Sequence, residues 1–409
     1  MVVVPSPAEL LGASCKLSSV PRKSAVLRLK RGRDRRARTH PWIFKGDVAD
    51  VSDVTAGDAV TVLDAGGRFV GRGLFNPRPA LCCRIYTWID EPLDRAFVAG
   101  RIPTAVQARE GCGREAVRLV WSEADGLPGL VVDRYGPVLV VQCLTLGMAR
   151  HRAGVVAALR ERLGDLPVVS MDDATMADLE GFEPVAGWLD RQGPDEVVVD
   201  EAGVRVAVRP GTGHKTGLYL DQAENRARVA VADGRGDVLD VFAYSAGFAC
   251  HALRAGGARA VCVESSAEAV AAARRNFELN GFADRAEIRA VNAFDELRRL
   301  DRERERFDLV VLDPPPFARG RTALASALRG YKEINLRALR VLAPGGRLAT
   351  FSCSHHVDET TFEATCHDAA ADAGVRLRVL DRLGQAADHP MLLTVPETRY
   401  LKGLLLEAL

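Results

Sequence analysis

Two turns that follow apolar strands carry the side chains best suited to chemistry. The apolar run from Phe307 to Leu312 is followed by an acid-proline-proline turn, Asp313 to Phe317. A later strand ends in Ser352-Cys353-Ser354-His355. A cysteine in an apolar strand is usually a core residue, whereas a thiol at the end of a strand can act as a nucleophile. The two turns together predict an acid, Asp313, beside a nucleophile, Cys353.

The element that must position this chemistry is an earlier strand, turn and helix. The mostly apolar strand pattern from Asp237 to Val241 is followed by a turn rich in small residues, 242–247, and then by a helical pattern. In a parallel sheet such a turn lies at the carboxyl end of a strand, where nucleotide-like ligands bind. A second strand ends in Glu264, whose carboxylate can accept both hydroxyls of a ribose. Nicotinamide-binding domains share this pattern, but Ala246 and Phe248 break their glycine motif.

The acid-proline-proline turn and the strand-end cysteine favour another class. These pieces resemble S-adenosylmethionine-dependent methyltransferases, and residues from about Lys23 to Leu409 are similar to the bacterial large-subunit rRNA cytosine-5 methyltransferase I family. Besides the turns above, the resemblance rests on His40-Pro41-Trp42-Ile43-Phe44, Asp125-Gly126-Leu127-Pro128-Gly129-Leu130, Lys215-Thr216-Gly217-Leu218-Tyr219-Leu220-Asp221-Gln222, Asp388-His389-Pro390 and Tyr400-Leu401-Lys402-Gly403.

The resemblance, together with the length of 409 residues, implies several domains. We expect a leader over 1–21 without order, because this stretch has no sustained period. A PUA-like β-barrel is expected over 22–94, a small central α+β domain over 95–200, and a Rossmann-like class I methyltransferase domain over 201–409. The last domain should hold a mostly parallel seven-stranded sheet of α/β class, closed by a hairpin near 375–380 and 400–407.

The cofactor that the resemblance implies is S-adenosylmethionine. Asp240 and the turn after it would face the amino-acid end of the cofactor, Glu264 the ribose, and Asn292 with Ala293 the adenine. The family usually has Asp at position 292 and Gly at position 246. From the residues alone, the stretch from Lys215 to Arg226 is a capped helix with a charged face. In full, the implied cofactor residues are Asp240, Phe242, Tyr244, Ala246, Gly247, Glu264, Asn292, Ala293, Asp313, Lys215, Thr216, Asp221 and Asn225.

The implied reaction is methylation of carbon 5 of a cytosine in 23S rRNA or its large-subunit precursor. This carbon is a poor nucleophile, so the enzyme needs covalent activation by Cys353, while Asp313 hydrogen-bonds the base. Pro314, Pro315 and Phe317 would shape the base pocket. Two other functions remain open, namely direct methylation of an amino group, which needs no thiol, and an RNA-binding assembly factor without turnover.

A basic segment near the start of the chain could contact phosphates. Residues 22–38 hold nine basic residues and one acid, Asp34, although the chain has a net charge of only +1. The resemblance places Arg38, His40, Trp42 and Lys45 near the nucleic-acid face of the barrel. The alternatives are a solvated strand face for the basic residues and core packing for Trp42.

Composition narrows the setting of the protein. No apolar run reaches the roughly 18 residues that span a bilayer, and the first residues lack the basic start of a secretory signal. Nine cysteines without regular spacing indicate reduced thiols and a cytoplasmic protein. We expect Cys82-Cys83 to be buried filler and His355-His356 to bind no zinc, since a third ligand with suitable spacing is missing. The family resemblance also allows a homodimer.

Overall fold

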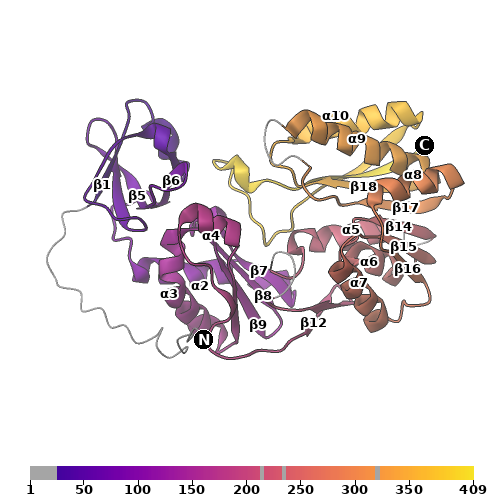
Figure 1. The fold of residues 1–409 in the computed structure, drawn as a ribbon, viewed down its shortest axis with the longest axis horizontal. Coiled ribbons are helices and arrows are strands. Elements are labelled where there is room, and N and C mark those ends of the chain that lie inside the picture. Colours follow the sequence, from indigo (N-terminus) through magenta and orange to yellow (C-terminus); the bar gives the residue numbers. More distant parts are fainter. Residues whose placement is uncertain (1–24, 212–215, 233–235, 318–322) are drawn as a thin grey trace, which may run out of the picture. The chain divides into compact units, whose positions relative to one another are not determined.

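The computed structural model describes residues 25–211, 216–232, 236–317 and 323–409. Two compact units make up this part of the chain (Figure 1). The first unit contains residues up to 110 together with 119–195, and the second contains 111–118 together with 196–409. The expected leader, 1–21, lies outside the described residues.

The first unit begins with a sheet of six short strands, in the order β2-β6-β5-β4-β1-β3. Its strands are β1 Val26–Leu29, β2 Trp42–Phe44, β3 Val48–Ser52, β4 Ala59–Leu63, β5 Phe69–Phe75 and β6 Leu81–Thr87. Alternation of apolar and polar residues predicts β1 and β4, whose inward side chains fill the core. The short strands β2 and β3 flank a turn and were not predicted.

The rest of the first unit contains helices and a five-stranded sheet, except that residues 116–118 of β7 are grouped with the second unit. Its strand order is β11-β10-β9-β8-β7. The elements are α2 Arg95–Gln107, β7 Ala116–Trp121, β8 Leu130–Tyr135, β9 Val138–Cys143, α3 Leu146–Leu163, β10 Val168–Met171, α4 Ala174–Glu180 and β11 Ala186–Trp188. The buried carboxylate of Glu180 joins the two sheets, because it accepts hydrogen bonds from Asn76 at 2.8 Å and Arg84 at 2.9 Å, both on or beside the first sheet.

The second unit is built on a seven-stranded sheet in the order β16-β15-β14-β17-β18-β20-β19. Five strands are parallel, and the last two, β20 and β19, pair antiparallel. The strands are β14 Asp237–Val241, β15 Arg259–Val263, β16 Ala286–Arg289, β17 Phe307–Leu312, β18 Leu342–Ser352, β19 Leu377–Gly384 and β20 Lys402–Ala408. The predicted seven-stranded sheet is thus confirmed, with the final hairpin a few residues further on than expected.

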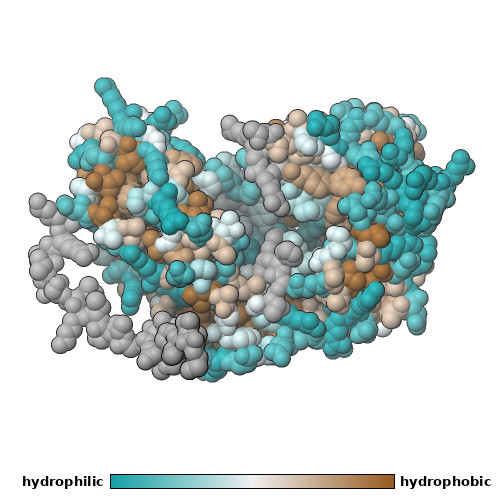
Figure 2. Space-filling model, viewed as in Figure 1, coloured by the Kyte–Doolittle hydropathy of each residue, from teal (hydrophilic) through white to brown (hydrophobic). Residues whose placement is uncertain are grey.

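Helices cover both faces of this sheet (Figure 1). The helices α8 Ala293–Glu303, α9 Leu324–Arg340 and α10 Glu359–Ala373 lie on one face, and α5 Ala223–Ala232, α6 Gly247–Arg254 and α7 Ala267–Asn280 lie on the other. The central strands are continuous apolar runs because they are buried on both sides. On the face seen in Figure 2, hydrophilic residues cover the region of α8.

A hairpin precedes the sheet and supports its first helices. It consists of β12 Val197–Glu201 and β13 Val204–Val208 and packs against α7. At its turn, Glu201 forms a bidentate ion pair with Arg226 of α5, at 2.6 and 2.7 Å. Both side chains are almost fully buried. Burial alone would raise the pKa of Glu201, but the guanidinium of Arg226 outweighs it and lowers that pKa.

Candidate active site

The predicted site turns meet at one edge of the seven-stranded sheet. The parallel strands β15, β14, β17 and β18 are neighbours in the sheet, so their carboxyl ends lie side by side. The residues that follow these four strands are Glu264, Phe242, Asp313 and Cys353. A row of strand ends of this kind is where open α/β sheets bind ligands.

The turn after β14 has an unusual backbone for residues other than glycine. Phe242, Tyr244 and Ala246 have positive φ angles of 63°, 47° and 60°. Left-handed geometry costs residues with a side chain roughly 1–2 kcal/mol each. Glycine is required at Gly247, where an added Cβ would lie 2.7 Å from Cδ of Arg226. The turn is therefore shaped by its surroundings and lets the backbone approach a ligand closely.

Asp240, near the end of β14, has a buried carboxyl group of which only one oxygen forms a hydrogen bond within the described residues. Its Oδ2 accepts a hydrogen bond from the backbone N–H of Ala249 at 3.1 Å. Its Oδ1 is buried and has no hydrogen-bond partner within the described ranges. Burial, with smaller contributions from Asp313 and Glu264, raises the pKa of Asp240 to about 8. Such a group suits a cationic ligand that would restore the missing interaction.

Glu264 and Asn292 both bind backbone amides. The carboxylate of Glu264 accepts from the N–H groups of Tyr244 at 3.0 Å, Ser265 at 2.7 Å and Ser266 at 2.8 Å. A carboxylate has about four acceptor positions, so Glu264 can still accept from a hydroxyl. The Oδ1 of Asn292 caps α8 by accepting from Phe294 at 2.9 Å. Ala293, the first residue of that helix, is buried.

Cys353 and Asp313 lie on neighbouring turns, as the sequence predicts. The thiol of Cys353 donates a hydrogen bond to the carbonyl oxygen of Pro314, with 3.9 Å between the two heavy atoms. Cys353 is partly exposed, whereas Cys250, Cys262 and Cys366 are buried. The Oδ1 of Asp313 accepts from Gln222 at 3.0 Å. The arrangement places a thiol, an acid and a proline-shaped turn in one small region.

Aromatic rings line the sheet edge beside this turn. Phe317 contacts Phe242, Phe294 and Tyr331, with ring centroids 6.3, 5.9 and 4.7 Å away. Phe317 is half-buried and belongs to this cluster. Pro315 is exposed and Pro314 is buried. Of the residues predicted to shape a base pocket, Pro315 thus faces solvent, and Pro314 faces the core.

The remaining predicted cofactor residues fall in a buried layer. Thr216 and Asn225 are 1% exposed, and the amide of Asn225 donates to Gln222 and to the carbonyl of Gly384. Asp221 is also buried and accepts a hydrogen bond from the hydroxyl of Tyr400 at 2.6 Å. Lys215 lies outside the described residues. The side chains of Asp221 and Asn225 therefore have internal partners in this structure.

Three side chains support the turn that carries Cys353; sequence reasoning gave no role to Tyr331 or Lys402, and the resemblance placed Gln222 near the ligands only as part of the stretch 221–226. Tyr331 hydrogen-bonds the hydroxyls of Ser352 at 3.0 Å and Ser354 at 2.9 Å. Gln222 holds Asp313, and Lys402 donates to the carbonyl of Ser354 at 2.8 Å. Gln222 and Lys402 stand in stretches that carry the family resemblance, which was the available signal. Tyr331 lies in an ordinary amphipathic helix and gave none.

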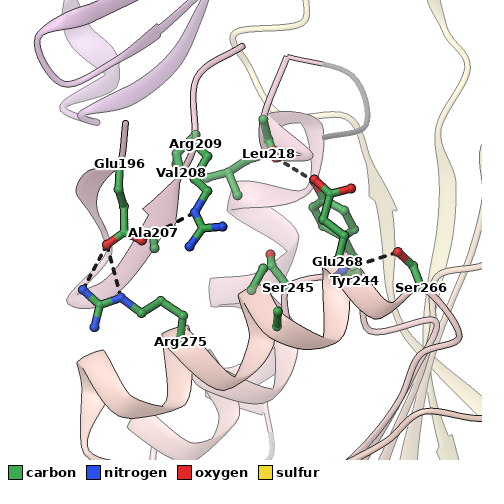
Figure 3. Close-up of a pocket in the computed structure, with 14 residues that line it drawn as sticks. Glu196, Ala207, Val208, Arg209, Leu218, Tyr244, Ser245, Ser266, Glu268 and Arg275 are labelled. Carbon is green, nitrogen blue, oxygen red and sulfur yellow. Dashed lines mark hydrogen bonds and ion pairs between the residues drawn. The ribbon is translucent and has the colours of Figure 1, made fainter. Parts of the chain in front are cut away.

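A pocket lies beside the turn after β14 (Figure 3). Residues of β13, of the start of α7 and of the turn line it, with an ion pair between Arg275 and Glu196 at 2.9 Å on one side. Tyr244 and Ser266 contribute to its wall. Cys353 and Asp313 are not among its lining residues, so this pocket is separate from the thiol and the acid.

The predicted RNA-contacting residues lie on the first sheet. Arg38 is exposed and forms ion pairs with Asp34 and Asp64, and the exposed Lys45 donates to the carbonyl of Arg78. The indole of Trp42 is half-buried and donates to Glu123 at 2.8 Å. His40 is only 4% exposed, and its ring accepts from the backbone of Trp42. His40 therefore shapes the loop in this structure and does not present its ring to a base.

Two general properties concern the described residues only. None of the helices there is long and apolar enough to cross a bilayer. In the same ranges, no group of three or more His, Cys, Asp or Glu side chains is arranged to hold a metal ion.

Comparison with known proteins agrees with this architecture. The family model described as S-adenosylmethionine-dependent methyltransferase matches residues 180–406, and one described as a PUA-like domain matches 27–88. Two solved structures share the fold. SMU.776, described as a methyltransferase complexed with SAH, has a TM-score of 0.82 at 17% identity and covers 93% of this chain and 99% of its own. A SAM-dependent methyltransferase from Streptococcus mutans has a TM-score of 0.80 at 16% identity, with 93% and 100% coverage.

Fold and family match together make this chain an S-adenosylmethionine-dependent methyltransferase with a PUA-like domain, which confirms the predicted fold class and cofactor. Ribosomal RNA large subunit methyltransferase I of Alteromonas mediterranea is 38% identical over 392 residues, or 94% of this chain and 99% of the relative. The protein of the same name from Shewanella denitrificans is 39% identical over 388 residues, or 92% and 98%. The chain belongs to the ribosomal RNA large subunit methyltransferase I family, as the sequence motifs predicted.

Proposed function

We propose that this enzyme methylates carbon 5 of a cytosine in 23S rRNA through a covalent adduct with Cys353. The observation that carries the proposal is the contact between the thiol of Cys353 and the carbonyl of Pro314, 3.9 Å apart. The carbonyl belongs to the residue that follows Asp313, and Cys353 is a partly exposed residue, which supports a joint role for the thiol and this acid. Direct methylation of an amino group would not need a nucleophilic thiol at this position.

The proposed steps use the side chains as follows. The thiolate of Cys353 forms a bond to carbon 6 of the base, and the electron pair of the ring double bond moves to carbon 5. Asp313 holds the exocyclic amine and the adjacent ring nitrogen, which favours the adduct. When bound, S-adenosylmethionine supplies an electrophilic methyl group. After carbon 5 has been methylated, a base removes its proton, the double bond re-forms, and the S–C6 bond breaks to return its electron pair to sulfur.

The residues at the sheet edge fit the cofactor. The buried Oδ1 of Asp240 has no partner among the residues described, and a cationic amino group could supply one. Glu264 retains acceptor positions for the ribose hydroxyls, and the left-handed turn opens the backbone at 242–246. We propose Asp240 with Phe242, Tyr244, Ala246 and Gly247 for the amino-acid end, and Asn292 with Ala293 for the adenine. Thr216, Asp221 and Asn225 are buried, and we propose that they support the cofactor site from within the core.

The Asp240→Asn variant tests this assignment through pH. Because burial raises the pKa of Asp240 to about 8, the carboxyl group is mostly protonated at pH 7, and a cationic ligand should ionise it. Affinity for S-adenosylmethionine should thus be higher in the wild type, by roughly 10–100-fold at pH 8. Measured by calorimetry, the ratio of wild-type to variant affinity should rise from pH 6 to pH 9, and taking the ratio removes titration of the ligand. Asp237→Asn, on the same strand but half-exposed, is the control. A ratio independent of pH would contradict the assignment.

We propose that the first sheet binds rRNA through the loop between β1 and β2. Six exposed basic residues gather there, and several have acidic partners, such as Arg33 with Asp47 and Arg38 with Asp34. Arg31 and Arg35 are exposed and have no ion pair within the ranges described. Such cations can bind phosphates without giving up an internal partner. Arg38, Trp42 and Lys45 stay in this proposal, while the burial of His40 takes it out.

Neutralising Arg31 and Arg35 together should weaken RNA binding in a salt-dependent way. The Arg31→Gln/Arg35→Gln variant should bind a 23S rRNA fragment roughly tenfold more weakly at low salt, and the slope of log K against log salt should fall by about 1.5. Filter binding at several salt concentrations measures both. Arg378→Gln/Arg382→Gln on β19 removes the same charge and serves as the control. Equal losses in the two variants would mean that only net charge matters.

The direct test of the function is the product. Tritiated methyl transfer from S-adenosylmethionine to 23S rRNA lacking the modification should give 5-methylcytidine, identified by nucleoside mass spectrometry. A methylated amino group as the product would show that the amine attacks the methyl group directly, without a covalent enzyme adduct. Absence of methyl transfer would favour an RNA-binding assembly factor. We further propose that the protein acts in the cytoplasm, where its rRNA or precursor is found, with a homodimer as the arrangement to test by light scattering.

A further inference from the structure

Lys402 is a buried cation that has no carboxylate partner among the described residues. It is 6% exposed and begins β20, directly opposite Ser352 of β18. Its ammonium donates to the carbonyl oxygens of Ser354 and Tyr400, each at 2.8 Å. Within the described part of the chain, no carboxylate lies within 4.0 Å of its nitrogen. Two of its three N–H donors are thus used, and only by neutral groups.

An arrangement of this kind is costly unless an anion joins it. Removing an ammonium from water carries an effective penalty of several kcal/mol, which two carbonyl groups offset only in part. The cost is visible in the pKa of Lys402, which burial lowers to about 8. Buried charges without a structural partner tend to mark functional sites. Lys402 is therefore expected to bind an anion.

The nearest candidate along the chain is Cys353. This residue lies between Ser352, the strand partner of Lys402, and Ser354, whose carbonyl binds the ammonium. The charge of a Cys353 thiolate acts on Lys402 in the favourable direction and is the largest such contribution. Asp358 and Glu359 also favour the ammonium, while Arg399 opposes it. Arg399 and Glu359 already pair with each other at 2.6 Å.

Several other titratable groups of the described residues act on Cys353 or on Lys402. His355 lies two residues after Cys353, and burial together with the charge of Lys402 lowers the pKa of its imidazole, which disfavours the cationic form. The acids Asp313 and Asp221 and the phenols oppose a thiolate or are neutral. Asp313 lies in the turn after β17, Tyr219 and Asp221 lie before α5, Tyr331 lies in α9, and Tyr400 lies just before β20.

We propose that Lys402 stabilises the thiolate of Cys353 as an ion pair and so prepares the nucleophile. The thiol proton leaves to solvent, Lys402 stays protonated, and sulfur keeps the electron pair that later bonds to carbon 6. Lys402 is thus a positioning residue that acts through Cys353. Its catalytic consequence rests on the proposed function, but the ion pair itself can be measured without RNA.

The test follows the reactivity of the thiol. The full-length wild type and the Lys402→Met and Lys402→Arg variants are alkylated with iodoacetamide from pH 5.5 to 9, and the Cys353 peptide is quantified by mass spectrometry. In Lys402→Met the midpoint should move to higher pH and the rate at pH 7 should fall about tenfold, which corresponds to one pKa unit. Lys402→Arg keeps the charge and should stay near the wild type. Cys112, the other partly exposed thiol of the described chain, is the internal reference and should not change.

The outcomes separate this proposal from others. An unchanged midpoint in Lys402→Met overturns it, as does an equal shift in the Arg variant, which would indicate lost packing. If Lys402→Met fails to fold, judged by S-adenosylmethionine binding, Lys402→Gln replaces it, since a glutamine amide can still donate to the carbonyl groups. If Lys402 shifts the midpoint but Cys353→Ala still transfers methyl groups, the ion pair stands and the covalent mechanism falls.

Discussion

Replacing Cys353 with alanine is expected to reduce methyl transfer to rRNA by about 10³-fold or more, because losing a covalent nucleophile typically costs this much. Binding of S-adenosylmethionine should stay within a factor of about two, since the thiol donates its hydrogen bond to the carbonyl of Pro314, which is not one of the residues proposed to hold the cofactor. Methyl transfer is measured with tritiated cofactor, and cofactor affinity by calorimetry on the same preparations.

A matched control and a trapped adduct sharpen this prediction. Cys366→Ala removes a buried thiol of α10 and should leave activity intact apart from a loss of stability. RNA with 5-fluorocytidine at the target should form a covalent complex with the wild type, visible on a denaturing gel, because no base can remove fluorine from carbon 5. Activity that survives in Cys353→Ala, or a complex that persists in that variant, would show that this cysteine is a packing residue.

The Glu201→Gln variant should destabilise the second unit by about 3–5 kcal/mol, the usual cost of leaving one charge of a buried pair alone. Glu201 makes two short hydrogen bonds to Arg226, which also packs against Gly247. Cofactor affinity should therefore fall as well. The measurement is urea unfolding at pH 7, following the transition that S-adenosylmethionine displaces, since ligand binding stabilises only the unit that holds it.

Glu196→Gln provides the comparison for this variant. Glu196 precedes the same hairpin and pairs with Arg275, but both side chains are partly exposed, so the cost should be at most about 1 kcal/mol. pH supplies a second check. Because Arg226 lowers the pKa of Glu201, its stabilisation is present above the ordinary glutamate value of 4.5 and is lost as the pH falls through its lower folded value. Equal effects of the two variants at pH 7 would contradict the role of burial.

Much of the fold could be predicted because local signals agreed with the tertiary structure. Apolar strand patterns marked β14 and β17, and α7 ends before Gly281, whose left-handed backbone caps the helix. The short strands β2 and β3 escaped notice because three to five residues beside a turn carry too little periodicity. The family resemblance implied a mostly parallel seven-stranded sheet, and the order of its strands was not predicted.

Sequence analysis singled out the residues at the strand ends but not the side chains that hold these residues in place. Cys353 and Asp313 stand in distinctive turns, so their types and order were enough. Glu201 and Lys402 act on partners 25 and 48 residues away along the chain, at Arg226 and Ser354. Pairings at that separation depend on how the sheet closes, which a single sequence does not encode in any local period. For the same reason, burial of His40 could not be foreseen from its motif.

The left-handed turn after β14 has a consequence for how this enzyme tolerates change. Where glycines form such a turn, its shape is intrinsic to the chain, and the neighbours are free to vary. Here Phe242, Tyr244 and Ala246 adopt the shape under constraint, with Glu264 holding the amide of Tyr244 and Arg226 lying against Gly247. The shape of the turn is therefore expected to be more sensitive to mutation of these neighbours than to mutation of the turn itself. Glycine at position 246 would relieve the strain there, whereas a change at Glu264 would remove the acceptor that holds the amide of Tyr244 and let the strained backbone relax.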